Sequence, residues 1–262
     1  MYIYTCFYIC KYKFANTPLM EKAMVAYYNE HNSTSAKWLR LLIENDLIAP
    51  GEVDDRSIED VTPSELSGYS QHHFFAGIGG WSLALRLAGW PDSRPVWTGS
   101  CPCQPFSAAG KSLGFDDERH LWPSFEWLIR QCHPATVYGE QVARKAGREW
   151  LAVVRSDLEA TGYAMGAADL PACAVGAWHE RPRHYWVAHS LRVQQRRQKP
   201  CRRTAGRMGR LIKSVSWDRG WQEALRELRS LDDGLSYGVG LTDGFRNAIV
   251  PPLAQAYVEC TM

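Results

Sequence analysis

The sequence predicts an α/β fold with a mostly parallel sheet, because short apolar stretches alternate with amphipathic stretches along much of its 262 residues. Two further observations favour this fold class. A glycine-rich turn follows the predicted strand at 72–76, and a polar loop with a cysteine follows the predicted strand at 95–100. An α/β enzyme exposes its reactive groups in such loops at strand ends. The length allows one full α/β domain and a small insert.

The predicted elements follow in order along the chain. Strands are expected at 22–30, 72–76, 95–100, 135–140, 163–170 and 183–188. Helices are expected at 34–46, 81–88, 118–132, 147–160 and near 218–230. The first helix is predicted from apolar residues at helical spacing, and the helix at 147–160 has an apolar face of Trp150, Leu151, Val154 and Leu158. Pro50-Gly51 is expected to break the pattern after the first helix.

Charge is distributed unevenly in this near-neutral chain. The net charge is only +2, so the global charge does not indicate a nucleic-acid partner. The segment from Arg192 to Lys213, however, contains many lysines and arginines and no acidic residue. Such a segment favours contacts with phosphates, and a solvated segment without fixed structure is the alternative.

Cysteine usage and hydropathy restrict the location and the class of protein. The eight cysteines are scattered and form no CxxC pair, so we expect neither a disulfide framework nor a metal site. A reducing cytoplasm fits this usage. No apolar run approaches the roughly 20 residues that span a bilayer, so no membrane partner is expected. Residues 1–19 are expected to be a disordered N-terminal extension of the fold.

The glycine-rich turn is Phe75-Ala76-Gly77-Ile78-Gly79-Gly80. Glycines let the backbone approach a ligand closely, and the N-terminus of the following helix favours a negative group such as a carboxylate. A tight strand-to-helix connection without a ligand is the alternative. The second loop contains Pro102-Cys103-Gln104, and its cysteine is a candidate nucleophile.

With both loops present, the chain resembles the C5-cytosine DNA methyltransferase family, most closely its compact phage and bacterial members. Three further segments in family order carry the resemblance: Gly139-Glu140-Gln141-Val142, His179-Glu180-Arg181-Pro182-Arg183, and the closing segment at 244–251. Gln141 stands in the place of the family's Asn, and His179 stands in the place of its Gln.

The resemblance implies methyl transfer from S-adenosyl-L-methionine to cytosine in double-stranded DNA. Cys103 is then the thiolate that adds to carbon 6 of a flipped cytosine. Glu140 protonates or hydrogen-bonds nitrogen 3, provided that partial burial raises its pKa. Arg181 and Arg183 alternate on a strand in this interpretation, and one of them holds the cytosine carbonyl or the target phosphate. Arg183 is the favoured candidate.

The order of the cofactor segments differs from the family pattern, and this predicts a permuted sheet in which the second and third strand units come first. Glu30 then binds the ribose hydroxyls, and Asp55 or Ser57, with Ile58, contacts the adenine. An unrelated N-terminal cap is the alternative for residues 20–60. The complete set of predicted cofactor residues is Glu30, Asp55, Ser57, Ile58, Phe75, Ala76, Gly77, Ile78, Gly79, Gly80, Pro102, Asn247 and Ala248.

Three segments follow from this interpretation: the extension at 1–19, a catalytic domain at 20–190 and 241–262, and a short basic target-recognition region at 191–240. The predicted DNA contacts are Gln104, Ser107, Arg196, Arg197, Arg202 and Arg203. We expect a monomer, and the resemblance allows a cognate restriction endonuclease as a partner. Two alternatives remain open: a tRNA cytosine-5 methyltransferase, and an inactive homologue that only binds DNA.

Overall fold

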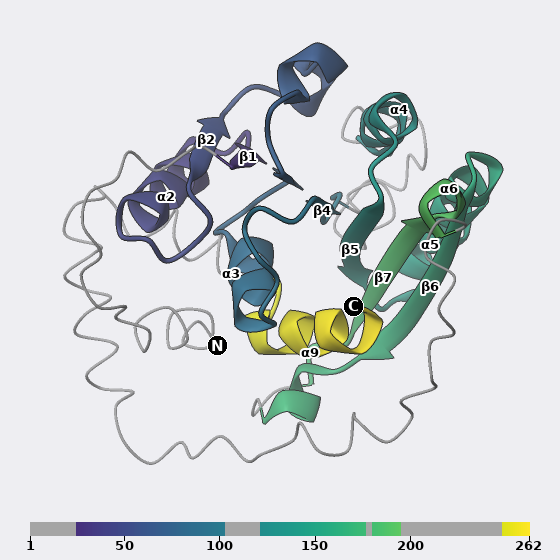
Figure 1. The fold of residues 1–262 in the computed structure, drawn as a ribbon. Coiled ribbons are helices and arrows are strands. Elements are labelled where there is room, and N and C mark those ends of the chain that lie inside the picture. Colours follow the sequence, from purple (N-terminus) through teal and green to yellow (C-terminus); the bar gives the residue numbers. More distant parts are fainter. Residues whose placement is uncertain (1–24, 103–120, 177–179, 195–247) are drawn as a thin grey trace.

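The computed structural model describes residues 25–102, 121–176, 180–194 and 248–262, and these contain one seven-stranded sheet (Figure 1). The strand order is β2-β1-β3-β4-β5-β7-β6. Their bounds are β1 Ala26–Asn29, β2 Gly51–Asp54, β3 Gln71–Phe74, β4 Val96–Gly99, β5 Thr136–Val142, β6 Tyr163–Leu170 and β7 Arg183–Ser190. The strands from β2 to β5 pair in parallel, whereas β7 is antiparallel to both of its neighbours. The predicted α/β class with a mostly parallel sheet is confirmed.

Helices cover both faces of this sheet. Their bounds are α2 Ser33–Glu44, α3 Gly80–Leu87, α4 Trp122–Cys132, α5 Lys145–Ala160, the short α6 Leu191–Gln194 and α9 Pro251–Thr261. Helices α4 and α5 share one buried cluster with the short 3-10 helices η1 (Ile58–Asp60) and η2 (Pro63–Leu66). Helices α2, α3 and α9 pack on the opposite face, where α9 lies beside α3 (Figure 1). Among these described helices, none is long and apolar enough to cross a membrane.

The local sequence explains why α2 and α5 form where they do. The Asn32 side chain caps α2 by accepting hydrogen bonds from the backbone N–H groups of Thr34 and Ser35. Helix α5 buries Trp150, Val154 and Leu158 against the sheet, which confirms the predicted apolar face.

Strand β2 and helix α9 are among the elements that the sequence analysis did not predict. We expected Pro50-Gly51 only to break the pattern after the first helix, but Gly51 is the first residue of β2. A Cβ atom at this position would lie 1.9 Å from the Ala26 carbonyl oxygen, so this strand start requires a glycine. Helix α9 was also missed, although its Pro251 occupies the first helical turn, where proline is favoured.

Gly139 on β5 gives a test of the packing against Trp186 of the neighbouring strand β7. A Cβ atom there would lie 2.2 Å from the buried Trp186 indole ring. We therefore expect Gly139→Ala to lower the free energy of unfolding by about 1–3 kcal/mol, because a fully buried indole has no room to retreat. Urea denaturation measures this change. Gly166→Ala on β6 is the matched control, since no atom lies within 4 Å of the Cβ position there; equal losses in both variants would contradict the expectation.

Candidate active site

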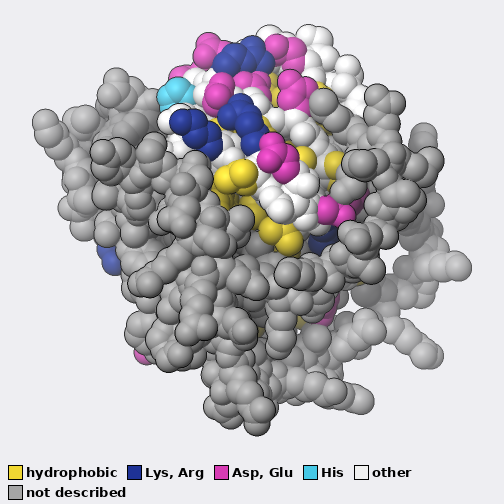
Figure 2. Space-filling view, turned by 90° about the vertical axis from the view of Figure 1, so that its left-hand side faces the viewer, with side chains coloured by type: hydrophobic (Ala, Val, Ile, Leu, Met, Phe, Trp, Pro, Cys, Tyr) yellow, Lys and Arg dark blue, Asp and Glu magenta, His cyan; other side chains and the backbone are white. Residues whose placement is uncertain are grey.

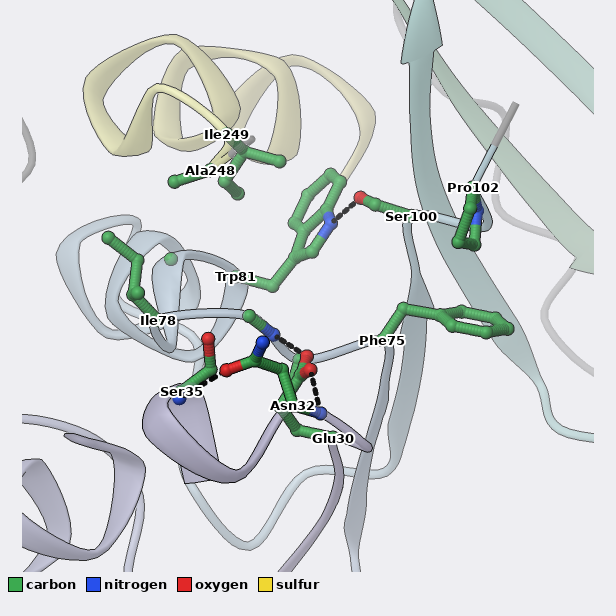
Figure 3. A pocket seen from close by; sticks show the side chains of 13 residues that line it. Glu30, Asn32, Ser35, Phe75, Ile78, Trp81, Ser100, Pro102, Ala248 and Ile249 are labelled. Atoms are coloured by element: carbon green, nitrogen blue, oxygen red, sulfur yellow. Dashed lines mark hydrogen bonds between the residues drawn. The ribbon is translucent and has the colours of Figure 1, made fainter. Parts of the chain in front are cut away.

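A cavity of about 250 Å³ opens at the carboxyl ends of β1, β3 and β4 (Figure 3). Most of the residues that the sequence assigned to the cofactor line it, namely Glu30, Phe75, Ala76, Gly77, Ile78, Gly80, Pro102 and Ala248. Sequence reasoning missed five other lining residues: Asn32, Ser35, Trp81, Ser100 and Ile249. Of these, Asn32 carries a recognisable signal, because Asn before a helical run is a typical N-cap.

Glu30 joins the end of β1 to the glycine-rich turn. Its carboxylate accepts one hydrogen bond from the Gly77 backbone N–H at 2.6 Å and another from the Asn32 backbone N–H at 2.9 Å (Figure 3). A carboxylate has about four acceptor positions, so further hydroxyl donors can still bind to it. Glu30 thus presents a negative group with spare acceptor capacity in the cavity wall.

The glycine-rich turn has the backbone conformation that its composition predicts. Gly77 has a φ of 56° and Gly79 has a φ of 81°, both in the left-handed region that glycine adopts without strain. Phe75 also has a positive φ, of 51°, which is unusual for a bulky residue. Gly79 does not line the cavity and instead packs against Leu39 and Leu42 of α2. The turn directs the N-terminus of α3 toward the cavity, as an anionic ligand would require.

The predicted adenine contacts lie outside the cavity lining. Asp55 forms an ion pair with Arg40 at 3.3 Å, and its side chain is 57% exposed. Ser57 caps η1, and Ile58 is buried in the cluster beneath α4. In the coloured part of the surface in Figure 2, basic and acidic side chains are mixed. Near β2, Arg56 forms ion pairs with Asp54 and Glu65.

Glu140 is buried at the end of β5 and forms an ion pair with Arg183, whose Nε lies 2.6 Å from Glu140 Oε1. Burial raises the pKa of the Glu140 carboxyl, and the positive charges of Arg183 and Arg181 oppose this rise. The carboxyl therefore keeps its proton to a higher pH than an exposed glutamate does. This is the property that the sequence analysis required of a proton donor.

Arg181 does not share a strand with Arg183, so the expectation that the two arginines alternate on one strand is wrong. Strand β7 begins at Arg183, and Arg181 precedes it with a φ of 34°, outside the extended region. The Arg181 Nη2 atom donates a hydrogen bond to the Ala248 carbonyl oxygen at 2.6 Å. Arg181 therefore contacts the cavity wall, whereas Arg183 contacts Glu140.

The loop that leads to Cys103 is attached to strand β5 at one point and to helix α3 at another. The buried Gln141 donates from Nε2 to the Cys101 carbonyl oxygen at 3.1 Å, and the Trp81 indole N–H donates to Ser100 Oγ at 3.0 Å. Gln141 also accepts a hydrogen bond from the Val142 backbone N–H. Several predicted site residues lie outside the described residues: Cys103, Gln104, Ser107, His179, Arg196, Arg197, Arg202, Arg203 and Asn247.

The comparison with known families gives a match in the part of the chain that contains strands β4 to β7. The C-5 cytosine-specific DNA methylase family matches residues 91–204. The match covers less than half of the 262 residues of the chain. Members of the C-5 cytosine-specific DNA methylase family use S-adenosylmethionine. The residues around the cavity fit such a cofactor, because Glu30 can accept hydroxyl donors and the α3 N-terminus can face a carboxylate.

Bacterial type II methyltransferases are among the similar proteins. M.PspPI of Psychrobacter sp. (strain TA137) is 29% identical over 147 residues, which are 40% of this chain and 35% of that protein. M.HhaI of Haemophilus parahaemolyticus is 26% identical over 177 residues, which are 52% of this chain and 54% of that protein. The chain thus spans about a third to about a half of these relatives. A solved Dnmt2 from Spodoptera frugiperda aligns with 78% of this chain and 51% of its own at 16% identity, with a TM-score of 0.46.

Proposed function

We propose that this chain transfers the methyl group of S-adenosylmethionine to carbon 5 of cytosine in double-stranded DNA. The observation that carries the proposal is the ion pair between the buried Glu140 on β5 and the partly buried Arg183 on β7. Gln141, the next residue after Glu140, binds the backbone of the loop that leads to Cys103. A proton donor and a nucleophile are thereby assigned to neighbouring strand ends, next to a cavity that suits the cofactor.

The roles follow from the chemistry of the cytosine ring, whose carbon 5 is a poor nucleophile. The Cys103 thiolate adds to carbon 6, and the displaced electron pair is taken up when Glu140 gives its proton to nitrogen 3. Carbon 5 becomes nucleophilic by this addition, and bound S-adenosylmethionine would supply the methyl group, its sulfur keeping the electron pair of the broken methyl–sulfur bond. Transfer of the carbon 5 proton to a base expels the cysteine thiolate from carbon 6. The proton on nitrogen 3 returns to the Glu140 carboxylate, which restores the neutral aromatic ring and the acid form of Glu140. Arg183 supports this sequence by stabilising the carboxylate that Glu140 becomes after it gives up its proton.

The cofactor supplies an electrophilic methyl group when it is bound. Glu30 would hold the ribose hydroxyls, and the backbone of the glycine-rich turn at the N-terminus of α3 would receive the carboxylate of the methionine moiety. Phe75, Ile78, Pro102 and Ala248 would supply the apolar wall.

We also propose that the sheet is permuted relative to the family order. Strands β1 and β2 come first in the chain, yet they lie beside β3, the strand that leads into the glycine-rich turn. The bond from Glu30 to Gly77 supports this, because it brings the acid of the first strand to the turn that follows the third. In the same proposal, residues 20–190 and 241–262 form the catalytic domain, and 191–240 form the target-recognition region.

Trapping of a covalent adduct tests this function. A duplex that carries 5-fluorocytosine at candidate sites should give a denaturation-resistant complex with the wild-type chain in the presence of S-adenosylmethionine, because fluorine at carbon 5 cannot leave as a proton does. Cys103→Ser should give none. The same assay with tRNA separates the two substrates: an adduct with tRNA alone would transfer the proposal to RNA. Duplex binding by wild type without an adduct would instead indicate an inactive DNA-binding homologue.

A further inference from the structure

Arg181 contacts the segment that closes the cavity, although the sequence assigned it to the cytosine or the phosphate. We propose that Arg181 is a positioning residue, whose guanidinium holds residues 248–250 in place as a wall of the cofactor cavity. The inference rests on the proposed function, since it takes this cavity to be the S-adenosylmethionine site. It differs from a catalytic role because Arg181 acts on the cofactor through Ala248.

The segment that Arg181 holds is the short stretch immediately before α9. Ala248 and Ile249 line the cavity, and Figure 3 shows them at the start of α9, next to Ile78. Ile249 also packs against Gly80, because the position of a Cβ atom at Gly80 is only 2.7 Å from Ile249 Cγ1. Val250 is buried in the cluster between α3 and the sheet. The wall is therefore attached by apolar packing on one side and by the Arg181–Ala248 hydrogen bond on the other.

The surroundings of Arg181 are suited to a fixed contact of this kind. The hydrogen bond from Nη2 to the Ala248 carbonyl is short, at 2.6 Å, and joins residues that are 67 positions apart. Burial and the like charge of Arg183 lower the pKa of Arg181, while the negative charge of Glu140 raises it. The hydrogen-bond geometry thus places the Arg181 guanidinium against the cavity wall, so its loss should weaken cofactor binding.

Equilibrium binding of S-adenosylmethionine without DNA tests this inference. Arg181→Met removes the donors and keeps much of the aliphatic stem, and we expect it to raise the Kd for S-adenosylmethionine about tenfold, the effect of losing one charge-assisted hydrogen bond. The KM for the cofactor should rise in parallel, while kcat at saturating cofactor falls less than tenfold. Arg181→Lys, which keeps one charged donor, should give an intermediate Kd.

The matched control is Arg86→Met. Arg86 also donates to a backbone carbonyl, that of Asp46 at 2.7 Å, but it does not line the cavity. Its loss should leave the Kd for S-adenosylmethionine unchanged. An equal rise in Kd for both variants would indicate general loosening and overturn the inference. An unchanged Kd with a reduced kcat or weaker DNA binding would also overturn it, because Arg181 would then act on the substrate.

Two further outcomes separate the inference from the proposed function. If wild type binds the cofactor and Arg181→Met binds it equally well, the inference fails and the proposed function stands. If wild type binds no cofactor, both fail. Thermal melting shows whether Arg181→Met folds, and if it does not, Arg181→Lys takes its place in the test. For Arg181→Lys, a raised Kd with kcat unchanged supports the inference. A reduced kcat with Kd unchanged contradicts it.

Discussion

Replacing Glu140 by Gln is expected to lower the rate of methyl transfer to cytosine by roughly 10²- to 10⁴-fold, the usual contribution of a general acid. The amide has nearly the same shape as the carboxyl group, but it cannot give up a proton to nitrogen 3. Transfer of a labelled methyl group to duplex DNA at saturating cofactor measures this loss. Binding of S-adenosylmethionine should change little, since Glu140 does not line the cavity.

The pH dependence of kcat gives the same prediction a second readout. Burial raises the pKa of Glu140, so the acid form that donates the proton is present up to a higher pH than in an exposed glutamate. The wild-type kcat should therefore fall as pH rises through this raised pKa. Glu140→Gln should lack that falling limb, because it has no group to titrate there.

A second glutamate provides the control for loss of a partly buried carboxylate. The Glu126 side chain on α4 is 17% exposed and lies 3.7 Å from Arg130, and burial raises its pKa as well. Glu126→Gln should leave methyl transfer unchanged. Similar losses in both variants would mean that the effect comes from destabilisation. Thermal melting of both variants measures this, since Glu140→Gln also removes the charge partner of the partly buried Arg183.

The parts of the site that could be predicted from sequence are those set by local signals. The glycine-rich turn is one of them, because its φ values require residues that tolerate a left-handed backbone. Glu30 is another, because it is the last residue of the first predicted strand and therefore lies at the carboxyl edge of the sheet, directly after β1. Each of these signals is contained within a few neighbouring residues.

The parts that could not be predicted depend on contacts between distant segments. The Trp81–Ser100 hydrogen bond joins α3 to the end of β4, and no local pattern indicates it. The start of β2 at Gly51 depends on the close approach of β1. In the sequence, the only sign of this approach is a glycine after a proline. The position of Arg181 depends on one unusual backbone angle, which periodicity cannot show.

Removal of the Glu30 carboxylate should weaken S-adenosylmethionine binding by about 10- to 100-fold, which corresponds to one or two charge-assisted hydrogen bonds. Two effects combine in Glu30→Ala. The ribose hydroxyls lose their proposed acceptor, and the Gly77 and Asn32 N–H groups lose the carboxylate that fixes the turn. Calorimetric titration with the cofactor measures the affinity.

Glu44→Ala, at the exposed end of α2, is the control and should bind as wild type does. A folded Glu30→Ala variant with wild-type affinity would remove the ribose role, and with it the main support for the permuted strand order.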